Sequence, residues 1–399
     1  MANPKNSDLN NPLVFFNHIR YLMILFVLLC HSSMSYSNLH IKWYVVDSGS
    51  SQFFDIYLLL CDVFVMTILF FIAGYFAIPS LQRKGTAAFL KNKFKRLGVP
   101  LLLGVTLLGP IMPYIRKVQF STGDISFSSY FWFWIGYLKS AGHIYVGPTV
   151  SKGQFSHFYF WYLSLLLAFF VVFCLLYKVR SKRLHSSTLH AQIGNTSSAP
   201  TLKVLLLFGI LTTVGFFTVI TFVPDRQWYT IGNLLFFQPT RLVLYISYFS
   251  LGIYAYSKKW FINGDAPRFF IFWLLICGLL IVGYLAMSRV LVEERSTELL
   301  FLFSLIRSFL CLSFLIVFTS FASRFWNRSS KVDKGFSENS YNIYIIHPPI
   351  VVLIQYFLSS WGLDWENIVW IKFGLVTVLS LTLSYGVSSY LIKSFLRFR

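Results

Sequence analysis

The sequence predicts an all-α, polytopic membrane protein with about ten transmembrane helices and both termini in the cytoplasm. Of its residues, 56% are hydrophobic and only 12% are charged, whereas a soluble protein carries about 25% charged residues. Aromatic residues make up 20%, which suits lipid-facing helices with aromatic belts at the interfaces. The whole chain, 1–399 with a core at about 11–395, reads as a single membrane domain. Hydropathy places the spans at about 19–37, 55–79, 99–116, 158–178, 203–223, 239–257, 269–289, 299–322, 341–360 and 370–393.

The distribution of charge predicts the orientation. A net charge of +20 could indicate a nucleic-acid partner, but Lys and Arg gather in alternate loops, most densely in 80–98 and 178–203. The acidic segment "EERSTE" at 293–298 falls on the opposite side. Because basic loops stay in the cytoplasm, we expect both termini inside and no nucleic-acid partner.

Three further features bear on class. The aromatic stretch "SSYFWFWIGYL" at 128–138 is too short to span and is expected to be interfacial or re-entrant. The first apolar run lacks a small-residue cleavage site, so we expect a retained helix and not a signal peptide. The cysteines all lie in apolar runs without paired spacing, which favours packing over a disulfide framework or a metal site; they are Cys30, Cys61, Cys174, Cys277 and Cys311.

The segment "NHIRYLMILFVLLCH", residues 17–31, places a cation and an imidazole in one span. Eleven steps along an α-helix complete three turns with about 20° left over, so Arg20 and His31 share a face about 16 Å apart. That separation is about half of a roughly 30 Å hydrocarbon core. The pattern suits a ligand that enters from one side and reacts near the middle. A structural hydrogen bond from His31 to a neighbouring helix is the alternative.

Other ionisable residues within spans are functional candidates, because they are costly in a bilayer. Asp62 is predicted at a depth near that of His31 and could fix the tautomer of the imidazole. Alternatively, Asp62 pairs with an arginine such as Arg307 and serves assembly only.

Two more clusters are candidates. Lys93 and Arg96 share a helix face and could bind phosphates, or they could be ordinary positive-inside flanking residues. In "NSYNIYIIHPPI", Pro348 and Pro349 predict a kinked or broken helix. His347 either lines a cavity there or caps the kink, and the candidate cavity-lining residues are Arg307, Tyr344 and His347.

The ordered set of these elements resembles the acyltransferase-3 family of integral membrane O-acyltransferases. The resemblance rests on Arg20 and His31 followed by "HSSMSYS", then "FFIAGYF", "KFKRLGVP", "SHFYFWYLSLL" and "NSYNIYIIHPP". It covers nearly the whole chain and is nearest to the subgroup that includes glucans biosynthesis protein C.

The resemblance implies an enzyme that moves an acyl group, acetyl or succinyl, from cytoplasmic acyl-CoA to a hydroxyl of an extracytoplasmic glycan. It further implies a multi-pass protein of a bacterial inner membrane, with membrane lipid, acyl-CoA and a glycan acceptor as partners and no metal. By family precedent His31 is the essential catalytic group, while Arg20, Lys93 and Arg96 contribute to the donor site.

This sequence departs from the family pattern in three places. Asn17 stands where the family often has Asp, and Ala73-Gly74-Tyr75 replaces the usual Ser-Gly-aromatic element. Lys93 stands in the first position of the usual Arg-x-x-Arg, and a lysine lacks the bidentate fork that suits phosphate.

Two rival functions use the same residues. A glycan or lipid transporter would line its pathway with buried ions and broken helices, although no inverted repeat is apparent. A non-catalytic scaffold subunit would not need Arg20 and His31 in phase. The identity of the acyl group, the acceptor and the oligomeric state are not encoded in any motif that we find.

Overall fold

The described part of the chain is almost entirely helical. The computed structural model describes residues 13–39, 43–121, 126–138, 146–148, 158–184, 200–232, 234–261, 267, 269–359 and 368–397. Within these residues, nine helices are long and apolar enough to cross a membrane, so the chain is a polytopic membrane protein. Eight of the nine correspond to α1 (Val14–Ser33), α2 (Gln52–Tyr75), α8 (Trp161–Leu184), α9 (Leu202–Phe222), α11 (Phe270–Glu293), α12 (Thr297–Phe325), α13 (Lys331–Ser359) and α14 (Ile368–Arg397), and the ninth is the segment Thr86–Phe120. A further long helix is α10 (Pro239–Ser257).

Each predicted span coincides with helix, but two differ from the expectation in detail. The segment predicted at 239–257 is α10, which is not among the nine because Arg241 and several tyrosines lower its hydropathy. The segment predicted at 99–116 belongs to a longer helical rod, Thr86–Phe120.

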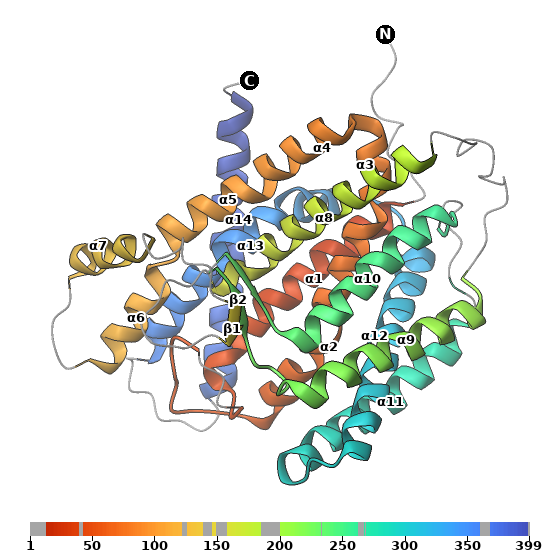
Figure 1. Cartoon of the computed structure of the whole chain (residues 1–399). Helices are drawn as coiled ribbons and strands as arrows, with labels where there is room; N and C mark the ends of the chain where they lie inside the picture. Colours follow the sequence, from red (N-terminus) through yellow and green to blue (C-terminus); the bar gives the residue numbers. More distant parts are fainter. Residues whose placement is uncertain are drawn as a thin grey trace.

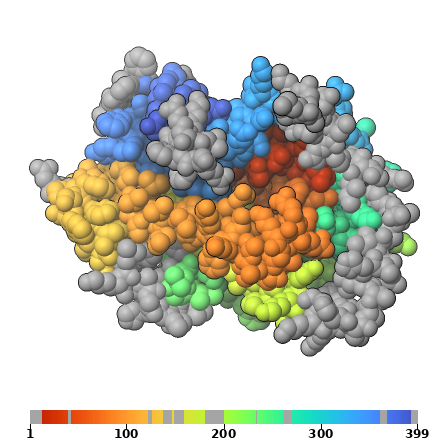
Figure 2. All heavy atoms as spheres, turned by 90° about the horizontal axis from the view of Figure 1, so that it is seen from above, coloured from red at the N-terminus to blue at the C-terminus, as the bar shows by residue number. Residues whose placement is uncertain are grey.

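This rod changes its hydrogen-bonding register twice. It comprises α4 (Thr86–Lys93), α5 (Val99–Leu103) and α6 (Ile111–Phe120), joined by the π-helical turns η2 (Phe94–Gly98) and η3 (Gly104–Leu108). It follows α3 (Ala77–Lys84), a short helix that continues from α2. Figure 2 shows the rod, in orange, lying across one face beside the C-terminal helices in blue.

Helices α1 and α2 form the centre of the molecule. Helix α1 contacts α2, α12, α13 and α14, and α2 packs most extensively against α10; Figure 1 shows α1 and α2 surrounded by the later helices. A Cβ atom on Gly74 would lie 2.0 Å from the carbonyl oxygen of Phe249, and one on Gly252 would lie 2.2 Å from that of Phe71. The glycine of the "AGY" element therefore permits the backbones of α2 and α10 to touch, as small residues do between membrane helices.

Short elements form in the segments that the charge pattern predicts to be outside. The strands β1 (Val146–Pro148), β2 (Tyr229–Ile231) and β3 (Leu235–Phe237) form a small antiparallel sheet. The aromatic stretch predicted at 128–138 forms α7 (Phe127–Leu138), a helix of 12 residues that is too short to span. All five cysteines are free thiols, four of them buried, in agreement with packing roles.

The sequence predicted a helix that is kinked or broken at the paired prolines, and the structure excludes the break. Helix α13 continues from Lys331 to Ser359 with Pro348 and Pro349 inside it. Each proline leaves the carbonyl four residues earlier without a backbone donor, and both prolines are buried in protein, where membrane helices tolerate such positions.

Candidate active site

Two histidines from α1 and α13 meet in the interior. His31 Nδ1 lies 2.8 Å from His347 Nε2. The ring centroids are 5.0 Å apart and the ring planes differ by 14°, so the two imidazoles lie nearly coplanar and meet edge to edge. His347 is fully buried, whereas His31 retains partial exposure. The pair is therefore a well-aligned hydrogen bond with one accessible member.

The hydrogen bonds fix which nitrogen of each ring carries a proton. His347 Nδ1 lies 2.8 Å from the carbonyl oxygen of Ile343, and a carbonyl only accepts, so Nδ1 of His347 must be the donor. In neutral His347, Nε2 is then an acceptor, and His31 must donate to it from Nδ1. His31 Nε2 is left as an unprotonated nitrogen with a free lone pair. The arrangement makes His31 a base or a nucleophile.

A row of tyrosines extends from the histidine pair toward Arg20, at the end of the bundle that the charge pattern predicts to be cytoplasmic. Tyr341, Tyr344 and His347 follow one another at three-residue spacing on α13, which keeps them close to one face. The Tyr344 ring centroid lies 6.1 Å from that of His347 and 5.7 Å from that of Tyr162 on α8. Tyr162 in turn lies within electrostatic range of Arg20. Tyr162, Tyr344 and His347 thus lie in series between Arg20 and His31.

A hydrogen bond from Tyr341 connects this row of tyrosines to Arg96, which lies in the π-helical turn η2. Pro100 has no N–H, so the carbonyl of Arg96, four residues earlier, loses its helical donor. The hydroxyl of Tyr341 donates a hydrogen bond to this carbonyl. A sequence feature of the "KFKRLGVP" element thereby couples the rod to the helix that carries His347.

The cations predicted for the donor site lie in one region of the molecule but have different surroundings. Arg20 and Arg96 lie within electrostatic range of each other. Arg20 donates to Ser337 Oγ at 3.5 Å, and its buried Nε has no hydrogen-bond partner among the described residues. Neither guanidinium pairs with a carboxylate in the described part of the chain. Lys93 is near Arg96, but its ammonium sits 3.7 Å from the centroid of the Phe170 ring.

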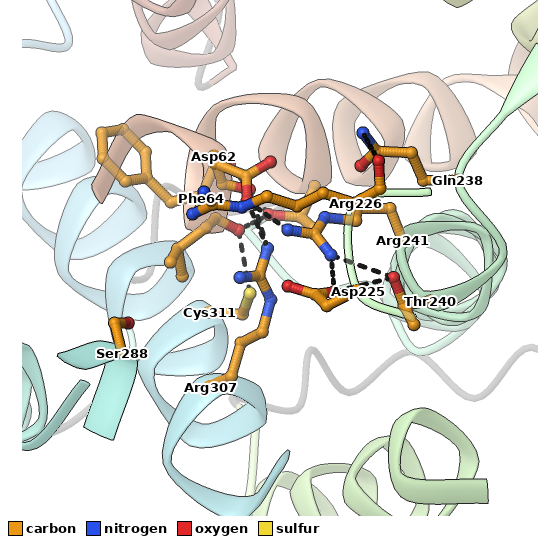
Figure 3. Close-up of polar contacts among 12 residues, drawn as sticks. Asp62, Phe64, Asp225, Arg226, Gln238, Thr240, Arg241, Ser288, Arg307 and Cys311 are labelled. Atoms are coloured by element: carbon orange, nitrogen blue, oxygen red, sulfur yellow. Dashed lines mark hydrogen bonds and ion pairs between the residues drawn. The ribbon is translucent and has the colours of Figure 1, made fainter. Parts of the chain in front are cut away.

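The expected pairing of Asp62 with His31 is not formed. Asp62 Oδ2 accepts from Arg241 Nη2 at 2.5 Å and from Arg307 Nη2 at 3.0 Å, and Arg241 also bridges to Asp225. Figure 3 shows the Asp62 carboxylate between the two guanidinium groups. Both arginines are buried, so each needs a charged partner. The arginine alternative for Asp62 therefore describes its contacts, and His347 occupies the position expected of Asp62.

Arg307 is part of this ion cluster. Besides Asp62, it donates to the hydroxyl of Tyr284 at 2.8 Å, and it is fully buried. The cluster joins α2, α10 and α12 in the half of the bundle near the start of α10 and α12.

Two residues at the histidine site were not anticipated from the sequence. Trp43 stacks near His31, and Gln355 of α13 contacts both Trp43 and the backbone of His31. The only available signal was an amide within the apolar run "IVVLIQYFL". Among the described residues, no group of three or more His, Cys, Asp or Glu side chains could hold a metal ion.

Nearly the whole chain matches one known protein family. The family model Acyl_transf_3, described as an acyltransferase domain, matches residues 13–389. The chain belongs to the acyltransferase-3 family. The predicted family is thereby confirmed, and the acyltransferase-3 match includes α1, α2, the helical rod and α13. The nearer resemblance to the subgroup of glucans biosynthesis protein C stays a prediction. No curated protein and no solved structure matches this acyltransferase-3 chain.

Proposed function

We propose that this membrane acyltransferase moves an acetyl or succinyl group from cytoplasmic acyl-CoA to a hydroxyl of an extracytoplasmic glycan, a periplasmic glucan by resemblance, in a bacterial inner membrane. The observation that carries the proposal is the hydrogen-bonded series from Ile343 through His347 to His31, which leaves His31 Nε2 unprotonated. Transfer from a thioester to an alcohol requires such a group.

The acyl-CoA donor would bind at the end of the tyrosine row where Arg20 and Arg96 lie. Arg20 and Arg96 have no carboxylate partners among the described residues, so they are free to hold the phosphates of CoA by charge-assisted hydrogen bonds. The thioester arm would then extend past Tyr341 and Tyr344 over the half-bilayer distance to His31.

The chemistry follows from the lone pair of His31. Acting as a base, Nε2 takes the proton of the acceptor hydroxyl as its oxygen attacks the thioester carbonyl. The C–S bond breaks, and the CoA thiolate takes the proton from His31, which restores neutral imidazole. Acting as a nucleophile, Nε2 instead attacks the thioester carbonyl, the C–S bond breaks, and CoA leaves as a thiolate while His31 becomes an acyl-imidazolium. The acceptor oxygen then attacks the acyl carbon, the bond from this carbon to Nε2 breaks, and the hydroxyl proton passes to the CoA thiolate. In both routes His31 becomes cationic for a time, which strengthens its hydrogen bond to His347.

The test uses full-length protein purified in detergent, with acyl-CoA as donor and a periplasmic glucan preparation as acceptor. We expect acyl transfer by the wild type and its loss in His31→Ala, with the fold verified by thermal unfolding. Full transfer by folded His31→Ala would overturn the scheme. Incubation with labelled acyl-CoA in the absence of acceptor separates the two routes, because only the nucleophilic route leaves label on the protein.

A further inference from the structure

The ring of Trp43 packs beside the imidazole of His31. Trp43 lies in the connection between α1 and α2, and its ring centroid is 5.2 Å from that of His31 with the planes 23° apart. Trp43 is itself buried, with 6% of its surface exposed. Together with the hydrogen bond to His347, this contact restricts rotation of the His31 ring.

Gln355 ties the backbone of His31 to the same tryptophan. Its Oε1 accepts from Trp43 Nε1 at 2.7 Å, and its Nε2 donates to the carbonyl oxygens of His31 and Ser32 at 3.0 and 3.1 Å. Because an indole N–H only donates, the orientation of the amide is determined. These carbonyls lie in the last turn of α1, where helical donors run out. Both the oxygen and the nitrogen of the Gln355 amide are therefore hydrogen-bonded, and the side chain is buried, with 1% exposure.

The connection that carries Trp43 is anchored on two helices, α6 and α14. Arg116 of α6 donates to the Trp43 carbonyl, and Gln119 both donates to and accepts from the backbone of Val46. Asp47 forms a buried ion pair with Lys372 of α14 at 3.0 Å. The tryptophan is thus held in place by the bundle.

We infer that Trp43 and Gln355 are positioning residues, which hold the His31 imidazole in the plane of His347 so that Nε2 points in one direction. The inference rests on the proposed role of His31. The two contacts are complementary, because Trp43 restrains the side chain and Gln355 restrains both Trp43 and the main chain at His31. The reaction needs this restraint, since a base displaced by about 1 Å loses on the order of 100-fold in rate.

The kinetic test uses Trp43→Leu, Trp43→Phe and Gln355→Met in the full-length protein. We expect Trp43→Leu and Gln355→Met to lower kcat by about 10- to 100-fold with little change in KM for acyl-CoA. Trp43→Phe keeps a ring beside His31 and should recover much of the loss. The matched controls are Trp132→Leu, on an exposed side chain of α7, and Gln238→Met, whose amide donates to the Arg226 carbonyl and to no other described residue. Both should keep wild-type kcat.

A second readout is independent of turnover. In ¹⁵N-histidine NMR spectra, assigned with His31→Gln, the wild type should show His31 as the single Nδ1–H tautomer, and Trp43→Leu should show a mixture. If Trp43→Leu and Gln355→Met keep wild-type kcat and one tautomer while His31→Ala is inactive, the positioning inference is wrong and the proposed function stands. If wild-type protein transfers no acyl group, the proposed function fails, and the spectra alone decide the positioning.

Discussion

His31 and His347 are separated by 316 positions in the sequence, and their Nδ1 and Nε2 atoms lie 2.8 Å apart. The first helix supplies the accessible imidazole, and α13 supplies the buried one that sets its tautomer. This relationship turns an isolated histidine in an apolar span into a defined base, and it leads to the first prediction.

Replacing His347 should impair His31 as a base and leave the binding site of the acyl-CoA donor intact. We expect His347→Phe to lower kcat by about 100-fold or more, within the range that a positioned general base contributes, because Nδ1–H of His31 loses its acceptor. KM for acyl-CoA should change little. His18→Gln is the matched control, since His18 is a buried histidine of α1 whose one hydrogen bond within the described part of the chain is to the Trp326 carbonyl, at 2.6 Å. A His347→Phe enzyme with normal kcat would show that the tautomer is set in another way.

Arg20 and Arg96, at the end of the tyrosine row opposite His31, should contribute to binding of the acyl-CoA donor. We expect Arg20→Ala and Arg96→Ala each to weaken CoA binding by roughly 10- to 100-fold, since a hydrogen bond to a charged group contributes about 1.5–3 kcal/mol. Lys93→Ala should have a smaller effect, because the Lys93 ammonium already faces the Phe170 ring.

Equilibrium binding of CoA to detergent-purified variants would measure these effects. Lys203→Ala removes an exposed charge from the start of α9 and serves as the control. Equal losses in all four variants would indicate that only overall charge matters.

Asp62 should be needed for assembly more than for turnover. Asp62→Asn leaves Arg241 and Arg307 buried without their shared carboxylate. Breaking a buried ion pair costs about 3–5 kcal/mol, and we expect less than this because the Asp62 side chain is 31% exposed. Thermal unfolding should show a lower Tm, while kcat per folded molecule stays near the wild-type value. An unchanged Tm with lost kcat would return Asp62 to the catalytic group.

The contact between α2 and α10 should tolerate no side chain larger than glycine. Gly74→Ala and Gly252→Ala place a Cβ against a backbone carbonyl, and such overpacking costs about 1–3 kcal/mol. Gly278→Ala, with nothing within 4 Å of its Cβ, should be neutral or slightly stabilising because alanine favours helix. Denaturation of the three variants in detergent would test this order, and equal stability of Gly74→Ala and Gly278→Ala would contradict it.

The predicted orientation is accessible to cysteine labelling. We expect Lys95→Cys to be protected from a membrane-impermeant thiol reagent in intact cells, and Glu294→Cys to react. Four of the native cysteines are buried and Cys30 is half-buried, so the background should be low. Labelling of Lys95→Cys in intact cells would reverse the topology.

The sequence alone determined the protein class, the positions of the helices and the family. Helix position follows from hydropathy and length, which are properties of neighbouring residues, so even α10 began and ended where expected. The phase of Arg20 and His31 could also be predicted, because both lie in the uninterrupted helix α1.

The tertiary structure alone decided which side chain meets which. The sequence predicted Asp62 as the partner of His31 and expected His347 to line a cavity or to cap a kink. No local pattern distinguishes a histidine that caps a kink from one that bonds an imidazole on another helix. The choice depends on how α1, α2, α10, α12 and α13 rotate and cross. Those rotations are set by packing, such as the backbone contact at Gly74 and Gly252, and by the need of two buried arginines for one carboxylate.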